Sequence, residues 1–235
     1  MRLLDLTTLS PDGRPAEIEA LCARAARPVP SEPSLRVAAV CVLPLFVSTA
    51  VASLAGTGVP VASVAGNFPS GLATASAKAD EAREAVAHGA REIDMVIDRV
   101  AMLAGDAGAV RREVAAVRAA VPGALLKVIL EACDLPPSLF AEAAAIAVDE
   151  GADFLKTSTG FGSRGASAGD VALLANVAAR AGRPVGVKAA GGVRSIADAS
   201  LYLRIAEGVL GPLDSTGFRI GASALLDRLT EALLA

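Results

Sequence analysis

Two lysines, Lys156 and Lys188, each end a run of apolar residues and are followed by glycines. The first run reads ADFLKTSTG over residues 152–160, and the second reads VGVKAAGG over residues 185–192. A lysine buried in a strand must find a counter-ion or lose its proton, because desolvation disfavours the ammonium form. Two such lysines in successive strands predict an amine that is kept partly neutral. We therefore expect Lys156 to be a nucleophilic amine and Lys188 to be the cation that lowers its pKa.

The expected shift is large enough to matter for chemistry. Two ammonium groups about 6 Å apart repel by roughly 3 kcal/mol at an effective dielectric near 20, which is about two pKa units. That repulsion takes a lysine from about 10.4 to about 8, and burial lowers its pKa further. A neutral lysine amine forms a Schiff base with a carbonyl, and the cationic nitrogen then draws electrons from the adjacent C–C or C–H bond. Asp94 is the expected proton relay for these steps.

The elements that carry these lysines repeat along the chain. Apolar segments with strand character are expected over 2–6, 35–43, 59–65, 91–97, 124–131, 152–157, 184–189 and 218–221. Helical segments alternate with them over 15–26, 46–54, 77–88, 107–120, 136–150, 169–181, 196–207 and 222–234. No long linker divides the 235 residues. The pattern predicts an α/β fold, a single (β/α)8 TIM barrel over residues 1–235, with an open doubly wound sheet as the alternative.

Charged residues stand inside several of these strands. Residues two apart along a strand share a face, so if Ile93, Leu155 and Val187 face the helices, the charges face the barrel axis. The charges expected there are Asp5, Asp94, Lys127, Lys156 and Lys188. Active sites of (β/α)8 enzymes lie at the carboxyl ends of the strands, which favours a catalytic cluster. For any single charge the alternative is a buried ion pair, such as Asp94 with Lys188.

Glycine-containing turns follow the last three expected strands, at residues 160–165, 191–194 and 221–223. Backbone amides in such turns form anion pockets, and the last loops of these barrels commonly hold phosphate. Arg194 and Ser223 add possible donors. An ordinary turn that needs glycine for positive φ explains any one loop, whereas three at one end favour phosphate. The first loop also reads G-x-G-x-x-G, but the next strand ends in Lys188 instead of the acid that a dinucleotide site requires.

Composition argues against several kinds of partner. The net charge is -3 and the basic residues form no run, so we expect no nucleic-acid partner. Residues 37–77 contain no Asp, Glu, Lys or Arg, yet prolines and glycines interrupt them at short intervals. No unbroken apolar helix of about 20 residues fits there, so we expect no membrane partner.

The cysteines and the histidine bear on cofactors and on cell compartment. The chain has 1 His and 3 Cys, and the cysteines are widely spaced without a C-x-x-C pair. This set does not make a zinc site, so we expect no metal and no cofactor. The spacing suits a reduced protein, and we expect a cytoplasmic location.

Seven segments resemble the deoxyribose-phosphate aldolase family in order and spacing over essentially the whole chain. They are LDLT at 4–7, NFPSG at 67–71, EIDMVI at 92–97, LKVILE at 126–131, FLKTSTG at 154–160, VKAAGGVR at 187–194 and RIGAS at 219–223. The resemblance implies a class I aldolase with a (β/α)8 fold. It implies reversible cleavage of 2-deoxy-D-ribose 5-phosphate to glyceraldehyde 3-phosphate and acetaldehyde, in deoxynucleoside catabolism.

The resemblance also implies roles for individual residues. The Schiff-base lysine falls on Lys156, the second lysine on Lys188 and the proton-relay aspartate on Asp94. Substrate and phosphate binding fall on Asp5, Thr7, Lys127, Thr159, Gly160, Gly191, Gly192, Arg194, Gly221 and Ser223. Members are often dimers or tetramers, so we expect a homo-oligomer that acts on phosphosugar and aldehyde substrates.

Some positions depart from the family pattern. Phe161 stands where some members have a lysine near the phosphate, and Ala224 stands where some have a second serine. Two other functions are also compatible with the loops and charges. One is a phosphosugar isomerase without a covalent lysine, and the other is a binding module in which the lysines only hold an anion. Replacing Lys156 by Arg separates the three functions.

Overall fold

Eight parallel strands form a closed barrel in the computed structural model, which describes residues 1–234. Neighbouring strands follow chain order from β1 to β8, and β8 pairs with β1. The strands are β1 Leu4–Thr7, β2 Ala39–Val42, β3 Val61–Ala65, β4 Glu92–Val96, β5 Leu125–Ile129, β6 Phe154–Lys156, β7 Gly186–Ala190 and β8 Phe218–Ala222. The predicted (β/α)8 barrel is confirmed, and the open-sheet alternative is excluded.

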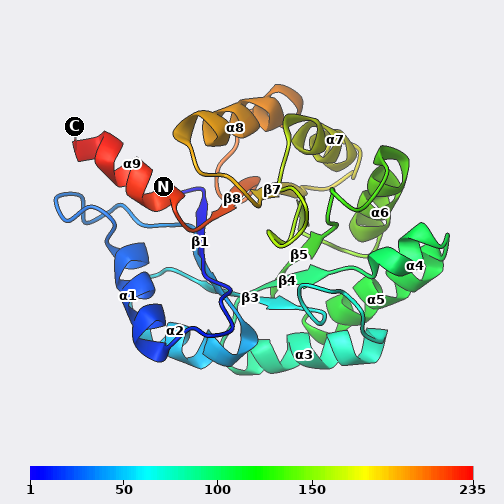
Figure 1. The fold of residues 1–235 in the computed structure, drawn as a ribbon, viewed down its shortest axis with the longest axis horizontal. Coiled ribbons are helices and arrows are strands. Elements are labelled where there is room, and N and C mark those ends of the chain that lie inside the picture. The colour runs from blue at the N-terminus through cyan, green and yellow to red at the C-terminus, as the bar shows by residue number, and fades with distance from the viewer. Residues whose placement is uncertain (235) are drawn as a thin grey trace.

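Helices surround the strands on all sides (Figure 1). They are α1 Pro15–Ala26, α2 Val47–Ser53, α3 Ala75–Ala87, α4 Arg99–Leu103, α5 Ala107–Ala120, α6 Pro137–Asp149, α7 Ala168–Ala178, α8 Ile196–Leu210 and α9 Leu225–Leu234, with a short 3-10 turn at Pro44–Phe46. Helix α9 closes the ring beside the amino-terminal end of the chain (Figure 1). No helix among residues 1–234 is long and apolar enough to cross a membrane.

Side-chain caps fix where several helices begin. Ser167 accepts a hydrogen bond from the backbone N–H of Asp170, whose carboxylate accepts one in return from the Ser167 N–H. Ser195 caps α8 through the N–H of Asp198. These caps satisfy backbone donors at the helix starts, and only the pair at Ser167 and Asp170 is reciprocal between side chain and backbone. They therefore fix the ends of the loops that follow β6 and β7.

The core lies between the barrel and the helices. Ile93, Leu155 and Val187 are buried there, together with helix residues such as Val114 and Val171. The alternate residues of the same strands point to the barrel axis, as predicted from the period of two. Strand register sets Asp94 beside Lys127, and Lys156 beside Lys188. The closed sheet thus brings charges from distant parts of the sequence into one interior.

Several elements differ from the prediction by a few residues at their ends, and two differences are larger or bear on the site. A short helix, α4, occupies Arg99–Leu103, where a loop is expected. The fifth strand ends at Ile129 instead of continuing to residue 131, and Glu131 has φ 53. The strand pattern fails there because the backbone turns into the left-handed region, which a non-glycine residue rarely adopts.

Candidate active site

Charged side chains fill the barrel interior, and nearly all are inaccessible to solvent. The cluster contains three carboxylates and four basic side chains: Asp5, Glu92, Asp94, Lys127, Lys156, Lys188 and Arg219. If every member were ionised, one positive charge would lack a partner. Buried unpaired charge is strongly unfavourable, so the cluster balances when one lysine is neutral.

Asp94 stands at the centre of the cluster. Its Oδ2 accepts hydrogen bonds from Lys156 Nζ and from Lys188 Nζ, both at 2.8 Å. Its Oδ1 accepts one from Lys127 Nζ at 2.7 Å. Burial alone would raise the pKa of Asp94, but the three lysines hold it well below its ordinary value. Asp94 is therefore a carboxylate that links the two lysines of interest through one oxygen.

Lys188 and Lys127 are each held by several carboxylates. Lys188 Nζ lies 2.5 Å from Asp5 Oδ2 in addition to its contact with Asp94, and Lys127 Nζ lies 2.6 Å from Glu92 Oε2. Burial acts to lower the pKa of both lysines, but the neighbouring carboxylates outweigh it and raise both values. Both lysines therefore keep their protons more strongly than an ordinary lysine does.

Lys156 has a different environment. Among residues 1–234, Asp94 is the one carboxylate within ion-pair distance of its Nζ. Burial lowers the pKa of Lys156, Asp94 opposes this effect, and the charge of Lys188 lowers the pKa again. The direction agrees with the sequence prediction, but burial contributes more than Lys188, which the prediction treated as the main cause. Lys156 is thus the lysine of the cluster that gives up its proton most readily.

Lys156 also reaches the floor of a cavity of about 480 Å³ at the carboxyl ends of the strands. Nine of the predicted site residues line this cavity: Thr7, Lys156, Thr159, Gly160, Gly191, Gly192, Arg194, Gly221 and Ser223. Asp5, Asp94, Lys127 and Lys188 are fully buried and contact one another instead of lining it. The predicted residues therefore form two layers, a buried charge layer and a cavity wall above it.

Close packing of glycines shapes the wall. Gly160, Gly191 and Gly192 have positive φ values of 94°, 81° and 72°. A Cβ at Gly221 would lie 3.0 Å from Lys188 Cε, so this glycine leaves room for the lysine side chain. The three loops predicted as an anion pocket thus meet at one cavity, with Arg194 on its rim. Clustered amides and an arginine suit an anionic group.

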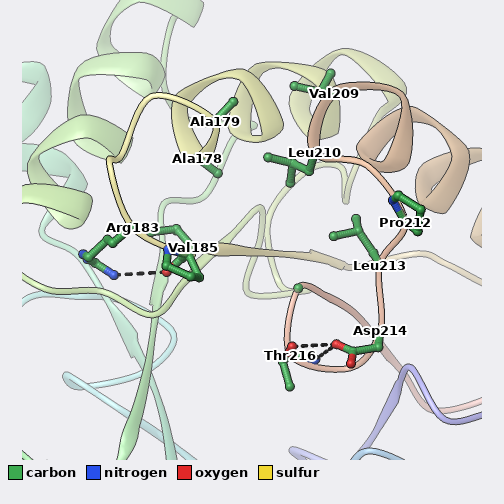
Figure 2. Close-up of a pocket in the computed structure, with 12 residues that line it drawn as sticks. Ala178, Ala179, Arg183, Val185, Val209, Leu210, Pro212, Leu213, Asp214 and Thr216 are labelled. Atoms are coloured by element: carbon green, nitrogen blue, oxygen red, sulfur yellow. Dashed lines mark hydrogen bonds between the residues drawn. The ribbon is translucent and has the colours of Figure 1, made fainter.

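A larger cavity, about 740 Å³, lies at the opposite end of β7 and β8 (Figure 2). Ala178, Val185, Leu210 and Leu213 contribute apolar side chains to it. Arg183 is used structurally, since its Nη2 donates to the backbone oxygens of Val148 and Ala152 at 2.8 Å each. This cavity lacks the titratable cluster, so the smaller one is the candidate active site.

Sequence reasoning missed several contributors. Arg219 pairs with Asp5 and Glu92 and lies over the Phe154 ring at 5.7 Å. The sequence could have predicted this role, because Arg219 is a charged residue within an apolar strand, as Lys127 is. Glu131 is also buried and contacts Thr159 in the cavity wall. The predicted strand 124–131 places Glu131 on the same face as Lys127, but the residue follows the end of β5 and contacts the cavity wall instead.

Comparisons with known proteins agree with this geometry. The sequence profile of the DeoC/LacD family aldolases matches residues 1–227. Deoxyribose-phosphate aldolase of Mycobacterium avium is 47% identical over 234 residues, covering 96% of this chain and 95% of that protein. The Deinococcus radiodurans protein of the same name is 44% identical over 218 residues, covering 93% and 94%.

A solved structure extends the similarity to three dimensions. Deoxyribose phosphate aldolase from Aeropyrum pernix, described as a tetramer, is 31% identical with a TM-score of 0.77, and the match covers 100% of this chain and 90% of that one. A profile match over nearly the whole chain and relatives of this identity identify the family. The chain belongs to the DeoC/LacD family of aldolases, enzymes that form and cleave carbon–carbon bonds.

Proposed function

We propose that the protein is a class I deoxyribose-phosphate aldolase. It reversibly cleaves 2-deoxy-D-ribose 5-phosphate to glyceraldehyde 3-phosphate and acetaldehyde, a reaction of deoxynucleoside breakdown. The names of the relatives support the substrate. The observation that carries the mechanism is the environment of Lys156, which combines a lowered pKa with access to the cavity. Neither Lys127 nor Lys188 combines these properties.

In the cleavage direction, the neutral Nζ of Lys156 attacks the C1 aldehyde of the open-chain sugar. The carbinolamine loses water and becomes an iminium ion. The C3 hydroxyl then loses its proton as the C2–C3 bond breaks, and the bonding electrons move onto the iminium to give an enamine and glyceraldehyde 3-phosphate. Protonation of the enamine at C2 and addition of water release acetaldehyde and restore the amine.

Asp94 and Lys188 have defined parts in this sequence. Iminium formation returns a positive charge to Lys156, and Asp94 Oδ2 at 2.8 Å stabilises it. The same oxygen accepts a hydrogen bond from Lys188, so a proton can pass between the two lysines through Asp94 or through water. Lys188 keeps its charge between steps because Asp5 also holds it.

The sugar phosphate binds at the other end of the cavity in this proposal. The turns at Gly191, Gly192 and Gly221 supply backbone amides, and Arg194 and Ser223 supply side-chain donors. The substrate-binding set is completed by Asp5, Thr7, Lys127 and Thr159. Of these, Asp5 and Lys127 lie in the buried charge layer, where they hold Lys188 and Asp94. Residues 1–235 work as one catalytic domain, without a metal or other cofactor.

Assembly and location belong to the same proposal. The tetrameric relative from Aeropyrum pernix supports a homo-oligomer. The three cysteines carry free thiols, which supports a cytoplasmic location. Sedimentation in solution measures the assembly directly.

Activity on 2-deoxy-D-ribose 5-phosphate tests the reaction. Lys156→Arg keeps a positive charge but removes the nucleophile, so kcat should fall by at least about 10⁴-fold. Lys78→Arg is the matched control, since Lys78 is equally buried but pairs with Glu113 outside the barrel. Full aldol cleavage by Lys156→Arg would disprove the covalent role of Lys156.

A further inference from the structure

Glu131 is a buried carboxylate just beyond the end of β5, outside the interior charge cluster. Its side chain has 0% exposure, and its backbone has φ 53. A non-glycine residue in this conformation is costly and persists only where its surroundings hold it. The conformation turns the side chain away from the barrel and toward the loop that follows β6.

The contacts of Glu131 are with Thr159, three residues after Lys156. Oε2 of Glu131 accepts a hydrogen bond from the Thr159 N–H at 3.2 Å and another from its hydroxyl. The hydroxyl oxygen of Thr159 in turn accepts from the N–H of Phe161 at 3.0 Å. Thr159, Gly160 and Phe161 are consecutive residues of the cavity wall. One carboxylate therefore sets the shape of this part of the wall.

Arg99 connects the same carboxylate to two more loops. Its Nη1 lies 3.5 Å from Glu131 Oε2, and its Nη2 donates to the backbone oxygen of Ser70 at 2.9 Å. Phe68, in the same loop as Ser70, meets the Phe161 ring edge to face at 5.6 Å. The contacts thus connect the loop after β3 to Arg99 after β4, Arg99 to Glu131 after β5, and Glu131 to the loop after β6. The two phenylalanines then connect the loop after β6 back to the loop after β3.

These contacts form a closed circuit, and they restrict the movement of the cavity wall beside Lys156. The members of the circuit are Glu131, Thr159, Phe161, Phe68, Ser70 and Arg99. Gly162 adds to the constraint, because a Cβ there would overlap Cys133 Sγ and lie 3.2 Å from Glu131. The lysine itself is held separately, by Asp94 from below. Loss of the circuit should therefore disturb the wall without disturbing the amine.

We propose that Glu131, supported by Arg99, is a positioning residue for the half of the substrate that carries the hydroxyl groups and the phosphate. It acts through Thr159 and Gly160 and does not touch the substrate itself. The inference rests on the proposed aldolase function, in which acetaldehyde occupies Lys156 and the rest of the sugar lies along the wall. Recognition of this half should depend on Glu131, whereas capture of acetaldehyde should not.

Two measurements on each variant separate these halves. The first is the KM for 2-deoxy-D-ribose 5-phosphate, and the second is the rate of borohydride trapping with acetaldehyde alone. Glu131→Ala should raise KM by about tenfold, since it removes hydrogen bonds to a charged acceptor. Glu131→Gln keeps an acceptor for Thr159, so its KM should stay within about threefold of wild type. Trapping at Lys156 should be unchanged in both variants.

Asp153→Ala is the matched control. Asp153 is half-buried, pairs with Arg118 and accepts the Leu126 N–H at 2.8 Å, so its loss also removes a carboxylate that holds a backbone amide. It precedes β6, whereas the cavity lies beyond the carboxyl end of that strand. We expect lower stability with an unchanged KM. If Glu131→Ala does not fold, Arg99→Ala tests the circuit from its partly exposed end and should raise KM by about threefold.

Clear results would overturn the proposal. One is a wild-type KM in folded Glu131→Ala, or in Arg99→Ala if that variant replaces it. The others are an equal KM rise in Asp153→Ala and a parallel loss of trapping in Glu131→Ala. These outcomes can be told apart from a failure of the proposed aldolase function. In that case the wild-type protein itself would show no trapped adduct.

Discussion

Three lysines from neighbouring strands share one buried interior, yet their contacts give them different chemistry. Lys127 and Lys188 each contact two carboxylates closely, whereas in the described part of the chain Lys156 contacts only one, that of Asp94. Burial therefore prevails at Lys156 and lowers its pKa, while it is outweighed at the other two. The number of carboxylate partners, more than the repulsion between lysines, therefore decides which lysine has a lowered pKa, and that lysine is the proposed nucleophile.

The pH dependence of the reaction follows from this difference. The rate should rise as the Lys156 amine loses its proton, at a pH below the ordinary lysine value of about 10.4. In Lys188→Met the rise should move to higher pH by about one to two units. Removing the cation ends its repulsion and frees Asp94 to stabilise the Lys156 ammonium. The measurement is kcat/KM against pH.

Lys78→Met serves as the control for that experiment. It also removes a buried lysine, but one that pairs with Glu113 between α3 and α5. Its pH profile should match that of wild type. A profile that does not move in Lys188→Met would show that Lys188 has no influence on the Lys156 amine.

At the scale of elements, the loops after β6 and β7 are locked to each other. The Ala166 N–H donates to the backbone oxygen of Ala190 at 3.0 Å, and a Cβ on Gly165 would overlap the Gly191 carbonyl. Tyr202 from α8 donates to the Ala166 oxygen at 2.8 Å. The turn at Gly191, which is the proposed anion site, is thus held by the preceding loop.

Gly165→Ala tests this contact. The added methyl group must push the two loops apart, so we expect a loss of about 1–3 kcal/mol in the free energy of unfolding. The KM for the phosphorylated sugar should rise, because Gly191 moves with its loop. Denaturant titration and steady-state kinetics measure the two effects.

Gly208→Ala is the counterpart on α8, where a Cβ would meet open space. It should stabilise the protein by about 0.5–1 kcal/mol and leave KM unchanged. If Gly165→Ala behaved as Gly208→Ala does, close packing of the two loops would not contribute to the site.

At the scale of the whole molecule, most of the barrel could be predicted from the sequence. The alternation of apolar strands with helices predicts the closed topology, and the period of two places Asp94, Lys127, Lys156 and Lys188 in one interior. These features follow local, repeating patterns. The prediction of helix 107–120 matches α5 at both ends, since Asp106 caps its start.

What escaped prediction depends on contacts between distant segments. Helix α4 is too short for a period, and it begins where Asp98 caps the Ala101 N–H. The strength of burial at Lys156 depends on how the whole barrel packs. Glu131 reaches Thr159 through a backbone turn that no residue type near it announces. Such features require the assembled structure.

Closure of the barrel makes the fold and the site one cooperative unit. Leu6 on β1 is fully buried in the core, so Leu6→Ala should cost about 2–5 kcal/mol. Thermal unfolding by circular dichroism and loss of activity should shift together, because the site takes residues from six of the eight strands. Leu201 is 41% exposed, so Leu201→Ala should change the free energy of unfolding by no more than about 0.5 kcal/mol. The temperature at which its activity is lost should also stay the same. Activity lost well before unfolding would contradict this unity.

Chemical trapping tests most directly whether Lys156 forms the covalent intermediate. The protein is incubated with acetaldehyde, reduced with borohydride and mapped by mass spectrometry. We predict an ethyl-sized mass gain confined to Lys156 and absent without acetaldehyde. An adduct on Lys188 would contradict the assignment of the nucleophile, and active protein without any adduct would contradict the Schiff-base mechanism.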